Sequence, residues 1–123
     1  MINSIGNDII EVARIKAILE KYGQKFLDRI FSKEEQAYCL SFDDPSPRLA
    51  GRFAAKEAIS KALGTGFGEE LSWLDITIRN APRGSPIVIL STKAALHFDS
   101  PQILVSISHC KEYATAVAIL INN

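Results

Sequence analysis

The sequence predicts an α+β fold, in which a helical N-terminal half packs on a mainly antiparallel sheet. Apolar residues recur at helical spacing between residues 11 and 63, and they alternate at strand spacing between residues 73 and 121. Hydrophobic side chains make up 47% of the 123 residues and charged ones 23%, which is typical of a folded globular protein rather than a disordered one. We therefore expect one domain covering residues 1–123.

The first element is expected to be a strand over residues 2–10 that ends near Asp8, because Gly6 and Asn7 interrupt its isoleucines. A carboxylate at a strand end is well placed to face a cleft. Aspartate is also common just before a helix, where it caps the first turn. Both interpretations of Asp8 are open from the sequence.

Three short helices should follow, over residues 11–22, 25–31 and 33–40. The first has an inward stripe of Val12, Ile15, Leu19 and Tyr22. Gly23 ends it, and Ser32 with Glu35 has the spacing of a capping box for the third.

A second face of this region is basic with one isoleucine: Arg14, Ile18, Lys21 and Lys25. Such a face suits docking of an acidic helix. It also suits an ordinary solvated surface, because basic residues in a last turn interact favourably with the helix dipole.

The central helix should begin at Pro47, with Ser46 as its cap, and stop at Gly64. Apolar residues lie on almost every side of it, which predicts a buried helix. Glu57 and Lys61 are four residues apart and share a face. Either they form an ordinary surface ion pair, or they are buried charges that need a further partner.

The second half should contain strands over residues 73–79, 87–90, 103–108 and 113–121, and a helix over residues 92–98 capped by Ser91. The last two strands form a hairpin. In the first strand, Leu74, Ile76 and Ile78 are expected to face inward.

Two further segments carry polar chemistry. Residues 64–68 read GTGFG, and glycines at this spacing either bring backbone N–H groups to a phosphate or form a flexible connector. His109 ends a strand near Ser106, Ser108 and Lys111, where it is either an anion donor, a general acid or base, or a structural histidine.

Composition excludes several classes of protein. Lys+Arg and Asp+Glu both total 14, so a protein that binds mainly a nucleic-acid backbone is disfavoured. Cys39 and Cys110 form no CxxC pair, which argues against a zinc site. With no secretory leader or membrane-spanning run in view, we expect reduced cysteines and a cytoplasmic location.

Asp8 and Glu57 are candidate carboxylates on separate elements, and Lys56 and Lys61 lie close to Glu57 in the sequence. Two oxygen ligands completed by water and phosphate is a common way to hold Mg²⁺. The residues by themselves therefore point to a protein that binds Mg²⁺ and a phosphorylated ligand.

Three segments together resemble the holo-[acyl-carrier-protein] synthases, the small 4′-phosphopantetheinyl transferases of bacterial fatty-acid synthesis. They are IGNDIIEVARI with Gly6, Asp8 and Glu11, then RFAAKEAISKALGTG with Phe53, Lys56, Glu57, Ala58 and Lys61, and SISHCKEYATAVAI with His109 and Tyr113. FSKEEQAYC and SWLDITI also look like family segments, so the resemblance covers nearly the whole chain. Asn7 departs from the small or β-branched residue usual before the aspartate.

The resemblance implies an Mg²⁺-dependent enzyme that moves 4′-phosphopantetheine from coenzyme A to a serine of apo acyl carrier protein and releases adenosine 3′,5′-bisphosphate. It implies that Asp8 and Glu57 bind Mg²⁺, that Lys61 contacts the phosphates, and that Glu57 or a water that it holds takes the serine proton. Coenzyme A would also meet Gly64, Gly66, Arg83 and His109.

The resemblance also implies a homotrimer with each site between two subunits. It gives Arg14, Ile18, Lys21 and Lys25 the role of docking the carrier. The alternative is a non-catalytic module of the same fold that binds coenzyme A or a nucleotide; the presence of Asp8, Glu57 and Lys61 disfavours it.

Overall fold

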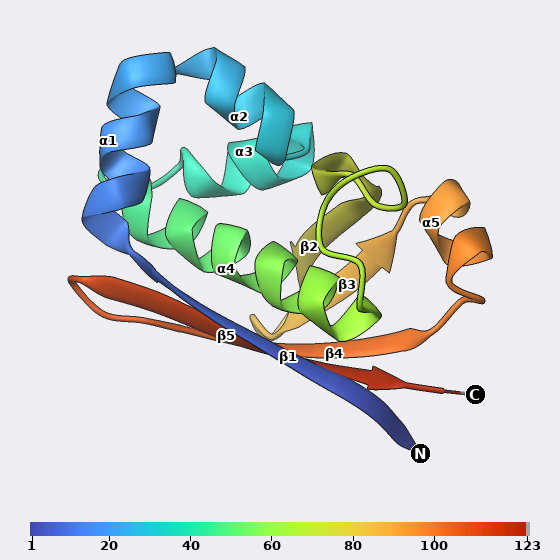
Figure 1. Ribbon diagram of the computed structural model, residues 1–123. Coiled ribbons are helices and arrows are strands. Elements are labelled where there is room, and N and C mark those ends of the chain that lie inside the picture. The colour runs from blue at the N-terminus through green and yellow to red at the C-terminus, as the bar shows by residue number, and fades with distance from the viewer. Residues whose placement is uncertain (123) are drawn as a thin grey trace.

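The computed structural model describes residues 1–122 and has the expected α+β architecture (Figure 1). In chain order the elements are β1 (Ile2–Glu11), α1 (Val12–Tyr22), α2 (Gln24–Ile30), α3 (Lys33–Cys39), α4 (Ser46–Leu63), the 3₁₀ helix η1 (Trp73–Asp75), β2 (Ile76–Asn80), β3 (Pro86–Leu90), α5 (Thr92–His97), β4 (Gln102–His109) and β5 (Tyr113–Ile121).

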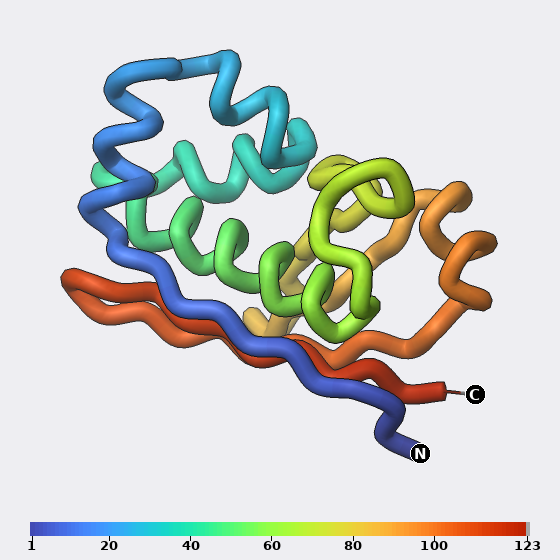
Figure 2. The backbone as a smooth tube through the Cα atoms, in the orientation of Figure 1, coloured from blue at the N-terminus to red at the C-terminus, as the bar shows by residue number. Residues whose placement is uncertain are grey.

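The strands form two antiparallel sheets. One has the order β1-β5-β4, and the other pairs β2 with β3. Helix α4 lies across the first sheet and contacts all three of its strands, while α1, α2 and α3 cover the opposite side of α4 (Figures 1 and 2). The central helix is therefore buried between a sheet and a helical layer, as its apolar surface predicts.

Small residues let α4 and the sheet approach closely. On the inner side, the buried small residues are Gly6 of β1, Ala114, Ala116 and Ala118 of β5, and Ala54, Ala58 and Ala62 of α4. A Cβ atom at Gly6 would overlap the carbonyl oxygen of Ala58 and lie 2.8 Å from the backbone nitrogen of Ala62. The prediction that β1 breaks at Gly6 and ends near Asp8 is therefore wrong, because glycine here serves close packing and the strand continues to Glu11.

The predicted strand over residues 73–79 is also corrected. Its first turn is η1, and the strand begins only at Ile76. Asp75 is buried because its carboxylate accepts hydrogen bonds from the Ser72 backbone and from the Ser91 hydroxyl, whereas Leu74 is half exposed. These polar contacts outweigh the alternating apolar pattern that favoured a strand.

Two smaller expectations differ at helix surfaces and ends. Tyr22, expected to face inward, is 53% exposed. Ser46 is the first helical residue of α4 rather than its cap, and its backbone N–H donates to the Asp44 carboxylate at 3.1 Å. The capping box of Ser32 with Glu35, the cap at Ser91 and the left-handed Gly64 are all present as predicted.

A fully buried ion pair joins α4 to α3. The Lys56 ammonium lies 2.7 Å from the Glu35 carboxylate, and both side chains are completely inaccessible to solvent. Lys56 also donates to the carbonyl oxygens of Ile30, at 2.7 Å, and Trp73, at 3.2 Å. Burial lowers the pKa of Lys56, and the Glu35 carboxylate partly offsets this effect.

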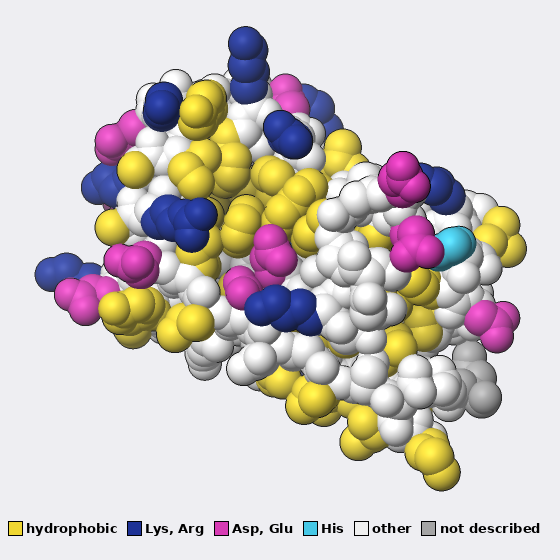
Figure 3. All heavy atoms as spheres, in the orientation of Figure 1, with side chains coloured by type: hydrophobic (Ala, Val, Ile, Leu, Met, Phe, Trp, Pro, Cys, Tyr) yellow, Lys and Arg dark blue, Asp and Glu magenta, His cyan; other side chains and the backbone are white. Residues whose placement is uncertain are grey.

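The outer side of the three-stranded sheet is open, and large apolar side chains lie on it among polar ones. Its exposed large hydrophobic residues are Ile5 and Ile9 of β1, Leu104 of β4 and Tyr113 of β5. Yellow side chains accordingly line the lower edge of the molecule in Figure 3. Within residues 1–122, no helix has the length and apolar character needed to cross a membrane.

Candidate active site

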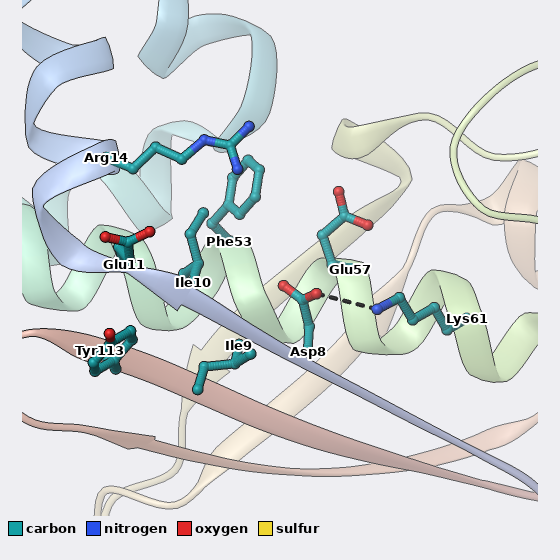
Figure 4. Close-up of a pocket in the computed structure, with 9 residues that line it drawn as sticks. All are labelled: Asp8, Ile9, Ile10, Glu11, Arg14, Phe53, Glu57, Lys61 and Tyr113. Carbon is teal, nitrogen blue, oxygen red and sulfur yellow. Dashed lines mark hydrogen bonds and ion pairs between the residues drawn. The ribbon is translucent and has the colours of Figure 1, made fainter.

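A cavity of about 380 Å³ opens where β1 crosses α4. It brings together three predicted site residues, Asp8, Glu57 and Lys61 (Figure 4). Arg14 of α1 and Phe53 of α4 also line it. Asp8 faces this cavity because it lies two residues after Gly6 on the same side of β1, and that side packs on α4.

Lys61 is paired with Asp8 rather than with Glu57. Its ammonium lies 3.1 Å from the Asp8 carboxylate and donates to the Asn7 carbonyl oxygen at 3.0 Å. The simple ion pair within the helix is therefore not what the structure shows. Among residues 1–122, no donor hydrogen-bonds to the Glu57 carboxylate, which points up into the cavity in Figure 4.

The electrostatics of the cavity favour a cation. Burial raises the pKa of Glu57, the negative charge of Asp8 raises it further, and Lys61 opposes both effects. Two carboxylates that line one cavity would each be stabilised by a shared positive charge. Hard carboxylate oxygens suit Mg²⁺, so Asp8 and Glu57 fit the expected ion. No group of three His, Cys, Asp or Glu side chains within residues 1–122 is arranged to hold a metal, so the remaining ligands would be water and phosphate oxygens.

Lys56 takes no part in this cavity. It was grouped with Lys61 as a cation for phosphate, but it is turned into the core by the contacts described above. Lys56 and Glu57 are consecutive residues of α4, and each residue turns the helix by about 100°. Lys56 therefore faces the core while Glu57 faces the cavity.

The glycine-rich segment after α4 closes the helix. The N–H groups of Gly64 and Gly66 both donate to the Ser60 carbonyl oxygen, and that of Gly68 donates to Leu71. These N–H groups are engaged within the protein, which disfavours the phosphate-binding alternative for this segment. Contact of Gly64 or Gly66 with coenzyme A stays a prediction.

His109 lies in a different pocket, of about 180 Å³, together with Asn80, Arg48 and Arg52. Arg52 is buried. Its guanidinium carbon lies 4.4 Å from the centre of the Tyr38 ring, and one terminal nitrogen donates to the Asn80 side-chain oxygen at 3.1 Å. Its Nε is a buried nitrogen without a hydrogen-bond partner among residues 1–122. Two arginines and a buried N–H group without a partner in residues 1–122 form an environment that suits an anion.

Arg48 and Arg52 were missed as site residues in the sequence. The available signal was their spacing, because two arginines four residues apart on one helix share a face. Arg83 is exposed on the connection between β2 and β3; its neighbour Gly84 lines this pocket, but Arg83 does not.

The predicted docking residues divide between two places. Arg14 lines the cavity of Asp8, whereas Ile18 and Lys25 line a separate groove of about 550 Å³ with Phe26, Arg29 and Trp73. Lys21 is exposed, and its ammonium stands 5.2 Å from the Tyr22 ring centre. The groove has an apolar floor with a basic rim, visible as yellow surface between dark blue side chains in the upper part of Figure 3.

Comparison with known proteins decides the family. The sequence model of the 4′-phosphopantetheinyl transferase superfamily matches residues 4–118. The chain belongs to this superfamily. A curated holo-[acyl-carrier-protein] synthase of Protochlamydia amoebophila is 57% identical over 94% of each chain.

Solved structures of this transferase family share the fold. The Helicobacter pylori holo-[acyl-carrier-protein] synthase in complex with coenzyme A has a TM-score of 0.87 at 42% identity, covering 94% of this chain and 98% of the other. The Bacillus anthracis enzyme, whose structure is in complex with CoA (3′,5′-ADP), has a TM-score of 0.87 at 44% identity, covering 100% of this chain and 99% of the other. The resemblance found in the sequence, the α+β fold and the expectation of a phosphopantetheinyl transferase enzyme are all confirmed.

Proposed function

We propose that this transferase moves the 4′-phosphopantetheine arm of coenzyme A to a serine hydroxyl of apo acyl carrier protein, in support of fatty-acid synthesis in the cytoplasm. The observation that supports it most is the meeting of Asp8, Glu57 and Lys61 in one cavity. The two carboxylates would hold Mg²⁺ with the pyrophosphate of coenzyme A, and the ion would supply charge stabilisation on the phosphate oxygens.

The residues of the chain have separate roles in this proposal. The Lys61 ammonium, held by Asp8 and by the Asn7 carbonyl, stabilises negative charge on the leaving phosphate. Glu57 accepts the proton of the serine hydroxyl, directly or through a water, because its carboxylate lines the cavity and accepts no hydrogen bond from residues 1–122. The serine oxygen then bonds to the β-phosphorus, and adenosine 3′,5′-bisphosphate leaves.

The decisive experiment is the intact mass of an apo acyl carrier protein after incubation with this protein, coenzyme A and Mg²⁺. We expect a gain of one phosphopantetheine that EDTA prevents. A carrier that a known transferase modifies but that this protein leaves unchanged would contradict the proposal. Binding of coenzyme A in calorimetry without any transfer would favour the non-catalytic module instead.

The pocket of Arg48, Arg52 and His109 is proposed to bind the 3′-phosphate end of coenzyme A. Two guanidinium groups, one with a buried N–H that has no partner in residues 1–122, suit a phosphate group. We expect Arg52→Met to raise the KM for coenzyme A by about tenfold while leaving the KM for 3′-dephospho-coenzyme A nearly unchanged, since loss of one charge-assisted hydrogen bond costs about 1.5–3 kcal/mol. Equal losses with both substrates would show that this pocket does not bind the 3′-phosphate.

The two pockets are proposed to meet across subunits of a homotrimer, so that one subunit supplies Asp8 and Glu57 and its neighbour supplies Arg52 and His109. The exposed apolar side of the sheet, with Ile5 and Ile9 each about two-thirds exposed at 65% and 66%, is the face that association would cover. We expect Ile5→Asp to give monomers in sedimentation analysis and to lower activity. Leu96→Asp, on the exposed side of α5, is the control that should leave assembly intact. A monomeric wild-type protein with full activity would contradict the trimer.

The basic groove is proposed to dock the carrier, whose surface around the modified serine is acidic. Ile18 supplies an apolar contact, and Lys25 supplies charge at the rim. We expect Lys25→Glu to raise the KM for the carrier by about tenfold and to leave coenzyme A binding intact. Lys93→Glu, which makes the same charge change on α5, should alter neither constant; an equal effect of both variants would show that only net charge matters.

A further inference from the structure

The buried ion pair of Lys56 and Glu35 also forms hydrogen bonds with several other segments of the chain. The three donors of the Lys56 ammonium are used by the Glu35 carboxylate, the Ile30 carbonyl at the end of α2 and the Trp73 carbonyl in η1. The other carboxylate oxygen of Glu35 accepts the backbone N–H of Ile78 in β2 at 2.8 Å. One pair therefore ties α2, α3, η1 and β2 to α4.

Stability alone does not account for such a pair. A buried ion pair contributes little net stability compared with apolar residues of the same volume, because both charges lose their water. The pair instead fixes the positions of the segments that it joins, because each buried donor or acceptor needs a hydrogen-bonding partner at one particular place.

The Trp73 end of the network leads to the cavity of Glu57. The Trp73 ring stacks on Phe53, with centres 4.9 Å apart, and on Phe67 at 3.8 Å. Phe53 lines the cavity beside Glu57, and Trp73 lines the groove of Ile18 and Lys25. The Phe53–Trp73 stack is thus the wall between the proposed reacting centre and the proposed carrier groove.

The Lys56 end of the network sets the direction of Glu57. The two residues are adjacent on α4, and three contacts anchor Lys56 on the side of the helix that faces α2, α3 and η1. Anchoring that side adds to the packing of α4 on the three-stranded sheet in holding the helix against rotation about its axis. The Glu57 carboxylate is thereby held toward the cavity, although no donor within residues 1–122 forms a hydrogen bond to it.

We propose that the Lys56–Glu35 pair is a positioning device that holds the carrier groove, through Ile30 and Trp73, at a set distance from Glu57. This inference rests on the proposed function. Transfer needs the carrier serine close to the phosphorus, and small misplacements of reacting groups lower rates strongly while binding is retained. Loss of the pair should therefore lower kcat far more than it weakens coenzyme A binding.

The test uses Lys56→Met/Glu35→Gln, which removes both charges and keeps the volumes. Trp73 is the only tryptophan in the chain, so its fluorescence reports the wall directly. We expect kcat to fall at least tenfold, the Kd for coenzyme A in calorimetry to stay within threefold, and quenching of Trp73 by acrylamide to rise at least twofold. The matched control is Lys33→Met/Glu34→Gln, which removes the same charges from the exposed side of α3.

Each outcome either supports or contradicts the positioning role of the Lys56–Glu35 pair. A folded double variant with wild-type kcat overturns the proposal, and so does a kcat loss with unchanged Trp73 quenching. If the double variant does not fold, Trp73→Ala leaves the ion pair intact and removes the stack; it should show the same kcat loss with retained coenzyme A binding, and wild-type kcat in this variant overturns the proposal. If the wild-type protein transfers nothing, the proposed function fails, and Trp73 quenching alone then decides whether the pair holds the wall.

Discussion

Glu57→Gln is expected to lower the rate of transfer by at least about a thousandfold, because it removes both a metal ligand and the proposed proton acceptor. The measurement is the initial rate of mass gain by the carrier at saturating coenzyme A. Glu69→Gln, an exposed carboxylate after α4, is the control and should keep the wild-type rate. A Glu57→Gln variant with more than about a tenth of wild-type activity would contradict its role as base and ligand.

The same variant is expected to be more stable than wild type in the absence of metal at neutral pH. Burial and the charge of Asp8 raise the pKa of Glu57 in the folded protein above its unfolded value. At a pH below the folded and the unfolded pKa, the Glu57 carboxyl is protonated in both the folded and the unfolded protein and does not affect stability. As the pH rises through the folded pKa, the free energy of unfolding falls, because the unfolded chain ionises more readily. Glutamine does not ionise, so we expect a Tm about 2 °C higher at pH 8 and no difference at pH 3.5. A gain of equal size at both pH values would show that the effect is not electrostatic.

Lys56→Met is expected to destabilise the protein by about 3–5 kcal/mol, because it leaves the Glu35 carboxylate charged and unpaired in a site that water does not reach. The measurement is urea unfolding followed by circular dichroism. Lys33→Met should change stability by less than about 0.5 kcal/mol, since its side chain is 87% exposed.

The double variant Lys56→Met/Glu35→Gln should recover much of that loss, because no charge then remains buried. A double variant that is less stable than Lys56→Met would mean that the hydrogen bonds of Glu35 to the Ser32 and Ile78 N–H groups outweigh its charge. The comparison therefore separates the cost of an unpaired charge from the cost of lost hydrogen bonds.

Local patterns predicted most elements because each depends on neighbours in the chain. Gly64 ends α4 with a left-handed residue, and Ser32 and Ser91 cap their helices, as the sequence indicated. Where prediction failed, a distant segment had decided the structure. Gly6 allows α4 to pack closely against β1 and does not interrupt the strand. Asp75 is buried because it accepts a hydrogen bond from the Ser91 hydroxyl.

The candidate site shows the same division. Asp8, Glu57 and Lys61 were identifiable by residue type, by spacing and by resemblance to a family. That Lys61 would pair with Asp8, and that Lys56 would turn away from Glu57 into the core, were not identifiable. Those choices depend on which side of α4 faces β1 and which faces α3.

The sequence by itself determined the α+β class, the family and the three residues at the proposed reacting centre, because these follow from short-range periodicity and from motifs. Only the tertiary structure decided which charges are buried, which face a cavity and which residues join Arg52 in a second pocket. Burial and pairing depend on contacts between segments that are far apart in the chain, such as Asp8 with Lys61 and Arg52 with Asn80. No local sequence pattern predicts those distances, because they depend on how closely the small residues of α4 pack against the small residues of the three-stranded sheet.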